Sequence, residues 1–343
     1  MLVNIFRSGG VIWRKITPFS YYRGMKFKIF LTVLFSLIYC FATHAQTSYR
    51  NEFGFKSEND AYLAQGQDRY YTNGLFLYFR RAINPEKFKN DKLSKKIWSA
   101  EAGQKMYNAQ FGNIPNIDYV DRPFAGYLYA GASLQWLYKN ESVLKTSVQI
   151  GVVGPSSLAE EGQELYHNIF GFYELNGWQY QVKDEAALNF AVNYDRLLLR
   201  SESRAVDLTS SSEARIGNSF SGLKTGIVFR AGSLNPLYHS TLTQSNVAVG
   251  QQPDAGNKEL YFFLKPSLDF VAYDATISGG LFRDDKGPKV FDSKSLVFSQ
   301  EIGVAFSQKR WTIDFSLLFK TKEVKSIAKA HQYGILDVYY RFN

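Results

Sequence analysis

Apolar and polar residues alternate with a period of two along most of the chain that follows residue 45. The segment 124–138 shows this alternation best. One face of it carries Leu128, Ala130, Ala132, Leu134, Trp136 and Tyr138, and the other carries Gly131, Ser133 and Gln135. Such alternation is typical of a β-strand with one face toward lipid or a core and the other toward water.

Twelve segments show this pattern, and an even number is typical of single-chain bacterial outer-membrane barrels. They are residues 48–58, 71–81, 97–107, 124–138, 143–154, 185–199, 205–211, 219–231, 259–275, 295–307, 311–322 and 332–342. No apolar stretch beyond residue 45 is long enough to cross a bilayer as a helix. We therefore predict an all-β fold, a transmembrane antiparallel β-barrel of about 12 strands with short helical segments in its loops.

The last segment has the two faces of an outer-membrane strand. Leu336, Val338, Tyr340 and Phe342 share one face, opposite Asp337, Tyr339 and Arg341. Aromatic residues make up 16 % of the chain, and their excess at strand ends favours the aromatic girdles of a membrane barrel. A soluble periplasmic sandwich or barrel would alternate as well and is the alternative fold.

The N-terminal segment reads as a secretory signal peptide. Lys26 and Lys28 precede an apolar run, 29–41, and small residues lead to Ala45. We expect cleavage after Ala45, which divides the chain into an N-terminal extension with signal peptide, 1–45, and a single barrel domain, 46–343. A retained anchor is the alternative, and the true start is either Met1 or Met25.

The charge balance and the cysteine content exclude several classes of partner and site. Removing residues 1–45 takes away six basic residues and no acidic ones, which leaves 34 basic and 31 acidic residues. This near balance argues against a nucleic-acid partner, which would need a concentrated basic stripe. No cysteine is left either, which excludes a disulfide framework and a cysteine-ligated metal.

Three segments interrupt the alternation with densely polar residues. They are 58–60 together with 68–74, then 121–126, then 153–181. They follow the first, third and fifth expected strands, so their loops emerge at one end of the barrel. If both termini are periplasmic, that end is the outer one. We expect the three loops to converge on one site.

The remaining interruptions predict ordinary connections. Residues 84–96 are expected to form a solvated turn, and 241–257 and 279–292 are expected to form loops. Within the last of these, 284–287 lacks the spaced oxygen ligands of a calcium loop. The connection between the eighth and ninth strands is long for the periplasmic side.

The segment 153–181 carries a candidate catalytic histidine. Ser157 and Glu160 have the spacing of a capping box, and Gly171 suits the end of a short helix. Gln163 and His167 are four residues apart, so on that helix they share a face. A glutamine there can hydrogen-bond or orient the imidazole and whatever it activates.

Two kinds of catalysis are open to this histidine. His239 and His331 are the other imidazoles after residue 45, and neither has a comparable setting. Ser156 or Ser157 could be a nucleophile beside a histidine, although Ser157 is better explained as a helix cap. Otherwise a histidine deprotonates water, aided by backbone amides or a hard cation.

Several oxygen donors lie in the same loops. Asn59, Asp60, Thr72 and Glu174 are donors of the kind that calcium prefers. The ordinary alternative is that Asn59 and Asp60 start a turn. Asp121 and Arg122 could likewise be a plain ion pair.

Together these motifs resemble the outer-membrane lipid A 3′-O-deacylase (LpxR) family. The resemblance spans nearly the whole chain after residue 45 and rests on several short motifs taken jointly. They are Asn59-Asp60, Asp68 to Gly74, Asp121 to Gly126, Gly154-Pro155, Gln163 with His167, and Gly177 to Gln181.

The resemblance implies a twelve-stranded barrel that removes the 3′ acyloxyacyl chain from lipid A of lipopolysaccharide in the outer leaflet, using a histidine and a calcium ion. It gives His167 the role of general base with Gln163 beside it, and Asn59 and Asp60 as further catalytic residues. It also implies Asp60, Thr72 and Glu174 as calcium ligands. We expect a monomer.

Two departures from the family pattern limit this transfer. Some members carry a Lys-Arg pair in the loop before the Asp-Arg motif, whereas 111–119 has no basic residue here. Glu174 lies one position later than the family's acidic residue. Two rivals stay open: an outer-membrane phospholipase with a strand-borne serine nucleophile, and a non-catalytic barrel that serves as a pore or anchor.

Overall fold

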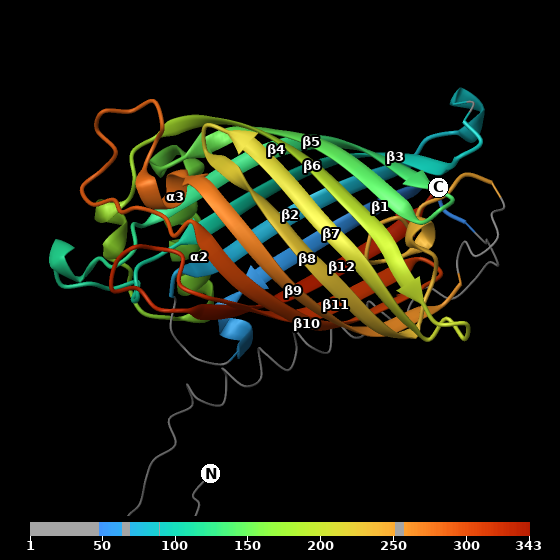
Figure 1. Ribbon diagram of the computed structural model, residues 1–343. Helices are drawn as coiled ribbons and strands as arrows, with labels where there is room; N and C mark the ends of the chain where they lie inside the picture. Colours follow the sequence, from blue (N-terminus) through green and yellow to red (C-terminus); the bar gives the residue numbers. More distant parts are fainter. Residues whose placement is uncertain (1–47, 64–68, 89, 251–256) are drawn as a thin grey trace, which may run out of the picture. The chain divides into compact units, whose positions relative to one another are not determined.

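The computed structural model describes residues 48–63, 69–88, 90–250 and 257–343, and there twelve antiparallel strands form a closed barrel (Figure 1). Each strand pairs with its neighbours in sequence, and β12 closes the barrel on β1. The strands are β1 (Asn51–Asn59), β2 (Tyr71–Ala82), β3 (Leu93–Tyr107), β4 (Ala125–Tyr138), β5 (Ser142–Val153), β6 (Glu185–Arg200), β7 (Val206–Gly217), β8 (Phe220–Ser233), β9 (Glu259–Asp274), β10 (Leu296–Gln308), β11 (Trp311–Lys320) and β12 (His331–Phe342).

Short helices lie in the connections. They are α2 (Ala159–Phe170), α3 (Ala275–Ser278) and the 3-10 turns η1 (Asp60–Leu63), η2 (Pro85–Lys87), η3 (Ile117–Tyr119), η4 (Pro155–Ser157), η5 (Gly177–Tyr180) and η6 (Leu237–His239). In the part of the chain that the structure describes, no helix is long and apolar enough to span a membrane. The expected all-β barrel is confirmed. The expected signal peptide lies outside the described residues.

The alternation reports which way each side chain faces. In β1, Phe53 and Phe55 are exposed on the outside of the barrel, whereas Lys56 and Glu58 line its lumen. In β12, Arg341 and Tyr339 are buried inside, as the two-faced pattern predicts. A polar lumen and an apolar outer wall are the reverse of a water-soluble protein and typical of a membrane barrel.

Opposite charges are paired inside the barrel. The lumen holds a cavity of about 490 Å³. Lys56 Nζ lies 2.8 Å from Glu58 Oε1, and an Arg215 guanidinium nitrogen lies 2.6 Å from Asp269 Oδ1. Buried charges need such partners, because an isolated ion loses its hydration without compensation.

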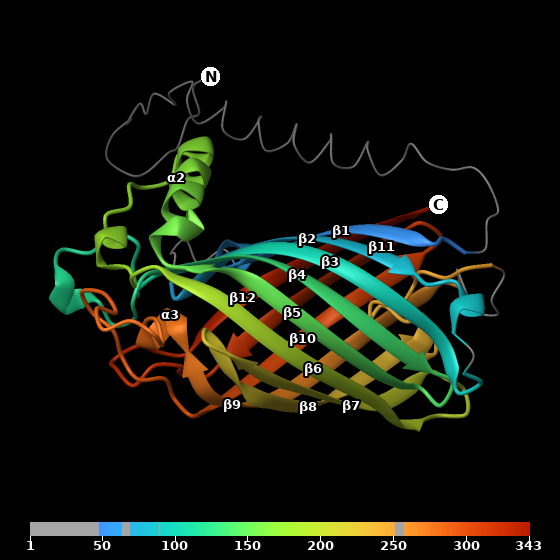
Figure 2. The same ribbon diagram turned by 90° about the horizontal axis from the view of Figure 1, so that it is seen from above.

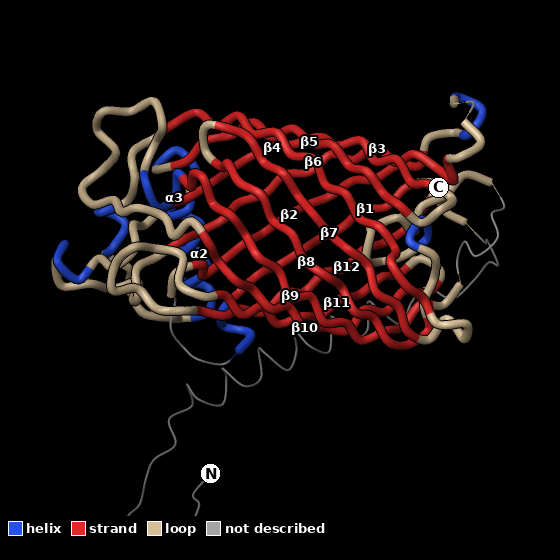
Figure 3. The backbone as a smooth tube through the Cα atoms, viewed as in Figure 1, coloured by secondary structure: helices blue, strands red, loops and turns tan. Residues whose placement is uncertain are grey.

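The barrel has two different ends (Figure 3). The end that we call the loop end carries the connection that follows each odd-numbered strand, together with α2 and α3. At the other, terminal end β1 begins and β12 ends. The three polar loops singled out in the sequence therefore emerge together, as predicted.

A segment between β8 and β9 fills the terminal end. Residues 234–250, which we call the plug, turn into the barrel and are largely buried. Lys95, which is 1 % exposed, donates from Nζ to His239 Nδ1 at 2.9 Å and to the carbonyl of Val247 at 2.8 Å. Gln135 of β4 donates to the Thr243 carbonyl at 2.8 Å.

The plug explains two errors of the sequence analysis. The prediction of a solvated turn over 84–96 is wrong from residue 93 onward, because β3 begins at Leu93 and the plug's carbonyl groups bind the Lys95 ammonium. The connection that looked too long for its side is a folded part of the barrel's interior. The twelve-strand count therefore stands, and 241–250 is a loop as expected, but a buried one.

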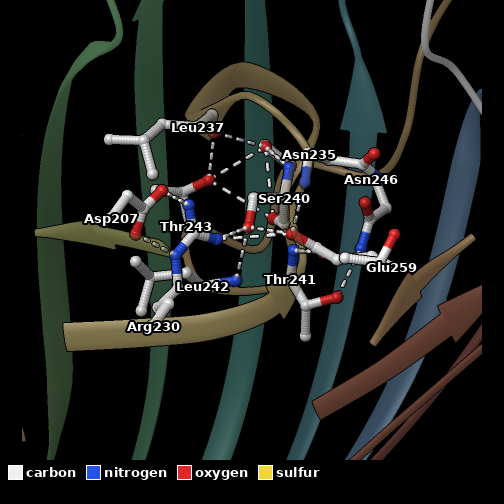
Figure 4. A network of polar contacts seen from close by, with 12 residues as sticks. Asp207, Arg230, Asn235, Leu237, Ser240, Thr241, Leu242, Thr243, Asn246 and Glu259 are labelled. Carbon is white, nitrogen blue, oxygen red and sulfur yellow. Dashed lines mark hydrogen bonds and ion pairs between the residues drawn. The ribbon is translucent and has the colours of Figure 1, made fainter. Parts of the chain in front are cut away.

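A buried ionic network fastens the plug to the wall (Figure 4). Arg230 is fully buried and donates to Asp207 at 2.6 and 2.9 Å and to Ser240 Oγ at 2.6 Å. Glu259 accepts from Ser240 Oγ at 2.7 Å and from the Thr241 amide at 2.7 Å. Each charge is thus met by an opposite charge or by plug donors.

Replacing Arg230 with methionine should destabilise the barrel. The change removes the cation beside Glu259 and leaves Asp207 with Arg200 as its remaining ionic partner, and breaking a buried network in this way costs about 3–5 kcal/mol. We expect a fall of that size in the free energy of unfolding, measured by urea titration of the protein in detergent or vesicles. The exposed Arg283→Met is the matched control, and an equal effect of both changes would contradict this account.

Candidate active site

Asn59 and Asn73 lie on the outer face of the barrel wall. Glu58 and Phe76 line the lumen, so alternation directs Asn59 and Asn73 outward. The two residues face each other across β1 and β2, and Asn59 Nδ2 donates to Asn73 Oδ1 at 2.7 Å. This polar pair differs from the apolar residues that cover most of the outer wall, and we take it as the first part of the candidate site.

A β-bulge places Thr72 beside Asp60. The pairing of β2 with β3 shifts register between Tyr71 and Asn73, which leaves Thr72 as the extra residue. Bulges re-aim side chains and are frequent next to active sites. Thr72 is fully buried and its hydroxyl donates to Asp60 Oδ1 at 3.3 Å, while the Arg69 amide donates to Asp60 Oδ2 at 2.8 Å.

Helix α2 also begins on the outer face. A Cβ placed on Gly162 would lie 2.8 Å from Met106, which faces outward on β3. Gln104 donates from Nε2 to the Ser157 and Leu158 carbonyls at 2.7 and 3.0 Å. Because Met106 pairs with Asn73, α2 lies next to the strand ends that carry Asn59 and Thr72. Figure 2 shows α2 rising from the wall at the loop end.

The start of α2 differs from the expected capping box. Its N-cap is Leu158, in a left-handed conformation with φ of 56°, and not Ser157. Ser157 Oγ is buried against Gly126 and has no hydrogen-bond partner among the described residues. The predicted end is confirmed: Gly171 has φ of 66° and its amide donates to the His167 carbonyl.

Gln163 and His167 share the buried side of α2, as predicted. Gln163 is 0 % exposed and its Oε1 accepts from Trp178 Nε1 at 3.0 Å. The Gln163 amide nitrogen has no hydrogen-bond partner among the described residues. The glutamine is therefore held by Trp178 and is not hydrogen-bonded to the imidazole.

The hydrogen bond of His167 fixes its tautomer. The imidazole Nδ1 lies 2.7 Å from the backbone carbonyl of Tyr173, which can only accept. Nδ1 therefore carries the proton, and in the neutral ring the lone pair is on Nε2. A general base needs this arrangement, with one nitrogen oriented by an acceptor and the other basic.

The Asp-Arg motif holds the loops together. Asp121 accepts from the Tyr70 hydroxyl at 2.8 Å and from the Gln110 amide at 2.9 Å. Burial raises the pKa of Tyr70, which keeps this hydroxyl protonated as a donor. Arg122 turns away, with its guanidinium 4.2 Å from the Tyr107 ring centre and 2.9 Å from Thr276 Oγ1. These two residues therefore form no ion pair with each other.

The glycines of the other motifs allow close packing around α2. Phe124 packs edge-on against Trp178, and a Cβ on Gly177 would lie 2.0 Å from the Phe124 ring. A Cβ on Gly126 would lie 1.8 Å from Ser157 Oγ and 2.4 Å from the Ala159 Cβ. These motifs thus position the helix that carries Gln163 and His167.

Gly126→Ala should impair the site while leaving the barrel closed. The added methyl overlaps Ala159 in the first turn of α2, so the helix must move off the wall. We expect about a tenfold or larger loss of activity, because small misplacements of catalytic groups are costly. The measurement pairs an activity assay with the heat-dependent gel shift of folded barrels. Full activity in a folded variant would contradict the packing described here.

The donor set around Asp60 has the chemistry that calcium prefers, but it is sparse. Asp60 and Thr72 bring a carboxylate and a hydroxyl together, and both are hard oxygen donors. The described residues contain no cluster of three or more His, Cys, Asp or Glu arranged for a metal. Glu174 is exposed, and its backbone carbonyl accepts from Asn113 Nδ2 at 3.5 Å. Its carboxylate does not contact Asp60 or Thr72.

The other candidate bases and nucleophiles are used elsewhere. His331 faces the lumen, 3.6 Å from Glu323, and His239 belongs to the plug. Ser156 donates to Asp184 at 2.8 Å, and neither Ser156 nor Ser157 hydrogen-bonds an imidazole in the described part of the chain.

Known proteins resemble the chain over most of its length. The model of the family described as outer membrane protein LpxR matches residues 29–342. Among solved structures, LpxR from Salmonella typhimurium has a TM-score of 0.65 and 19 % sequence identity, covering 85 % of this chain and 100 % of that one. At this identity the likeness shows the fold. No curated protein sequence matches the chain.

Two further solved structures match with lower TM-scores. The beta domain of the Bordetella autotransporter BrkA has a TM-score of 0.46 and 10 % identity, covering 86 % of this chain and 99 % of that one. The translocator domain of the autotransporter NalP from Neisseria meningitidis has a TM-score of 0.39 and 8 % identity, covering 94 % and 98 %. The family match over residues 29–342 shows that the chain belongs to the outer membrane protein LpxR family.

Proposed function

We propose that this protein is an outer-membrane esterase that removes the 3′ acyloxyacyl chain from lipid A of lipopolysaccharide, with its loop end facing outward. The observation that carries the proposal is the position of the site. Asn59, Thr72 and α2 lie on the outer face of the wall, where a lipid in the membrane can reach them. A site for a water-soluble substrate would more naturally open into the lumen or the water above the loops.

His167 has the arrangement required to activate water. Nε2 would accept a proton from water as the water oxygen bonds to the ester carbonyl carbon. When the bond between that carbon and the sugar oxygen breaks, the imidazolium returns its proton to the oxygen. The products are a sugar hydroxyl and the free acyloxyacyl acid. The Tyr173 carbonyl accepts a hydrogen bond from Nδ1–H throughout and stabilises the charged ring.

Asp60 and Thr72 are the residues that would hold a calcium ion. Their hard oxygen donors suit that ion, and backbone carbonyls, water or the substrate would have to complete its coordination. Calcium bound there would polarise the ester carbonyl and stabilise its developing negative charge. Glu174 is the third proposed ligand, and its exposed carboxylate would have to move to reach Asp60.

Gln163 and Asn59 are proposed to position the reacting groups. The buried Gln163 amide nitrogen has N–H groups that no described residue accepts, so it is suited to donate to a substrate oxygen. Asn59 accepts from the Ala61 amide at 2.6 Å and donates to Asn73, which fixes the backbone at Asp60.

Purified protein can be tested on two lipids. We expect it to release a 3′-linked acyloxyacyl acid from lipid A micelles containing calcium, and to leave phospholipid micelles intact. Mass spectrometry of both lipids gives the readout. Fatty acid release from phospholipid alone would support the phospholipase alternative and contradict this proposal, as would no reaction with either lipid.

We also expect the barrel not to conduct ions. The plug closes the terminal end, and at the loop end Tyr71 packs against Tyr107 and Tyr333 with ring centres 5.1 and 4.7 Å apart. In planar bilayers the wild-type protein should show no stable current steps. Reproducible steps from folded protein would instead support the pore alternative.

A further inference from the structure

The side of α2 that faces away from the site is apolar and exposed. Gln163 and His167 are buried, whereas Leu165 is 62 % and Ile169 is 67 % exposed. At 3.6 residues per turn, Leu165 and Ile169 lie roughly 160° around the helix from His167. Leu158, the N-cap residue of the helix, is 53 % exposed. We call these three residues the apolar stripe.

The stripe projects from the outside of the barrel. Ala159 and Gly162 fix the first turns of α2 against the outward faces of β3 and β4, through Met106 and Gly126. From there the helix runs away from the wall and not into the lumen (Figure 2). The stripe therefore meets whatever surrounds the barrel at the loop end.

The outward residues of the neighbouring strands indicate what surrounds the barrel at this end. Leu75 of β2, Ile150 of β5 and Leu188 of β6 face outward and are 43 %, 62 % and 46 % exposed. Such a surface belongs against hydrocarbon in an outer-membrane barrel. An amphipathic helix beside it, with an apolar side and acidic residues elsewhere, has the form of a segment lying in the membrane interface.

We propose that the apolar stripe of α2 inserts among the acyl chains of the outer leaflet. The inference rests on the proposed function only for the orientation of the loop end. It deepens that function, because an anchored α2 holds His167 at the depth where acyl chains join the sugar headgroup. The substrate can then be processed without leaving the membrane.

Lipid-borne quenching tests the insertion without any need for activity. Cys40 is the only cysteine of the chain, so a Cys40→Ser background allows Ile169→Cys to carry a single fluorophore. Glu164→Cys, exposed on the same helix but roughly 140° away from Ile169, is the matched control. Each labelled protein is placed in phosphatidylglycerol vesicles with or without nitroxide groups on the acyl chains.

We expect the label at residue 169 to be quenched several-fold more strongly than the label at residue 164. The label at Leu165→Cys should be quenched as strongly as the label at Ile169→Cys, so the result does not depend on how one variant folds or labels. Equal, weak quenching at residues 164, 165 and 169 in folded protein would overturn the inference. Disulfide-linked dimers of the unlabelled Ile169→Cys protein, with no lipid quenching of the labelled one, would also overturn it and assign the stripe to a second copy of the chain. An inactive protein with a quenched stripe would refute the proposed function and leave the insertion standing.

Discussion

His167→Ala is expected to lower the rate of lipid A deacylation by about 10²–10⁴-fold, the usual contribution of a positioned general base. The variant loses the Nε2 lone pair that the Tyr173 carbonyl fixes through Nδ1. The barrel should be unaffected, because α2 stands outside the wall and its backbone hydrogen bonds do not depend on the imidazole. The measurement is the initial rate with purified protein and lipid A micelles at saturating calcium.

Asn168→Ala is the control for this change. Asn168 is the next residue of α2 and is exposed. It should keep close to the wild-type rate. A His167→Ala variant that is folded and loses less than about tenfold would contradict the role of His167 as the base.

Asp60→Asn is expected to raise the calcium concentration for half-maximal rate by about tenfold or more, because ligand charge strongly tunes calcium affinity. The amide keeps the size of the side chain and an oxygen beside Thr72, so the bulge should survive. The rate is measured while calcium is titrated from a chelated start. Recovery of the rate at high calcium would show that the change weakens cation binding and does not distort the site.

Glu174→Gln provides the comparison for the metal site. Glu174 is exposed, and the described residues show no hydrogen bond from it to Asp60. An unchanged calcium requirement would remove Glu174 from the ligand set and leave Asp60 and Thr72. A calcium requirement raised as much as in Asp60→Asn would show that the segment after α2 moves toward Asp60. If neither variant changed the calcium requirement, the proposed cation site would be wrong.

The barrel could be predicted because alternation reports directly which side chains face lipid and which face the lumen. The alternation did not give the strand boundaries correctly where polar residues occupy both faces of a strand. The expected seventh strand, 205–211, ended too early because Ser210 to Glu213 are all polar, whereas backbone pairing with β6 and β8 carries β7 to Gly217. The plug was missed for a related reason. Lys95 looks solvated in the sequence, and only the folded plug supplies the carbonyls that bury it.

The site was predictable in part. The i, i+4 spacing placed Gln163 and His167 on one side of a helix, and the order of the strands brought the three polar loops to one end. Other features depend on contacts distant in sequence or on backbone atoms, which residue types do not reveal. These are the Tyr173 carbonyl that orients His167, the bulge at Thr72, and the position of the site outside the wall. The hydrogen bond from Trp178 to Gln163 joins residues fifteen positions apart, and the sequence did not predict it either.

The measurement that tests the central claim most directly is the lipid A mass spectrum of cells that express the protein. A strain with intact lipid A would produce wild type or His167→Ala, each with and without a calcium chelator. We predict that lipid A loses the mass of its 3′ acyloxyacyl chain only with wild-type protein and available calcium. Intact lipid A in calcium-replete cells with folded wild-type barrel in their outer membrane would contradict the account.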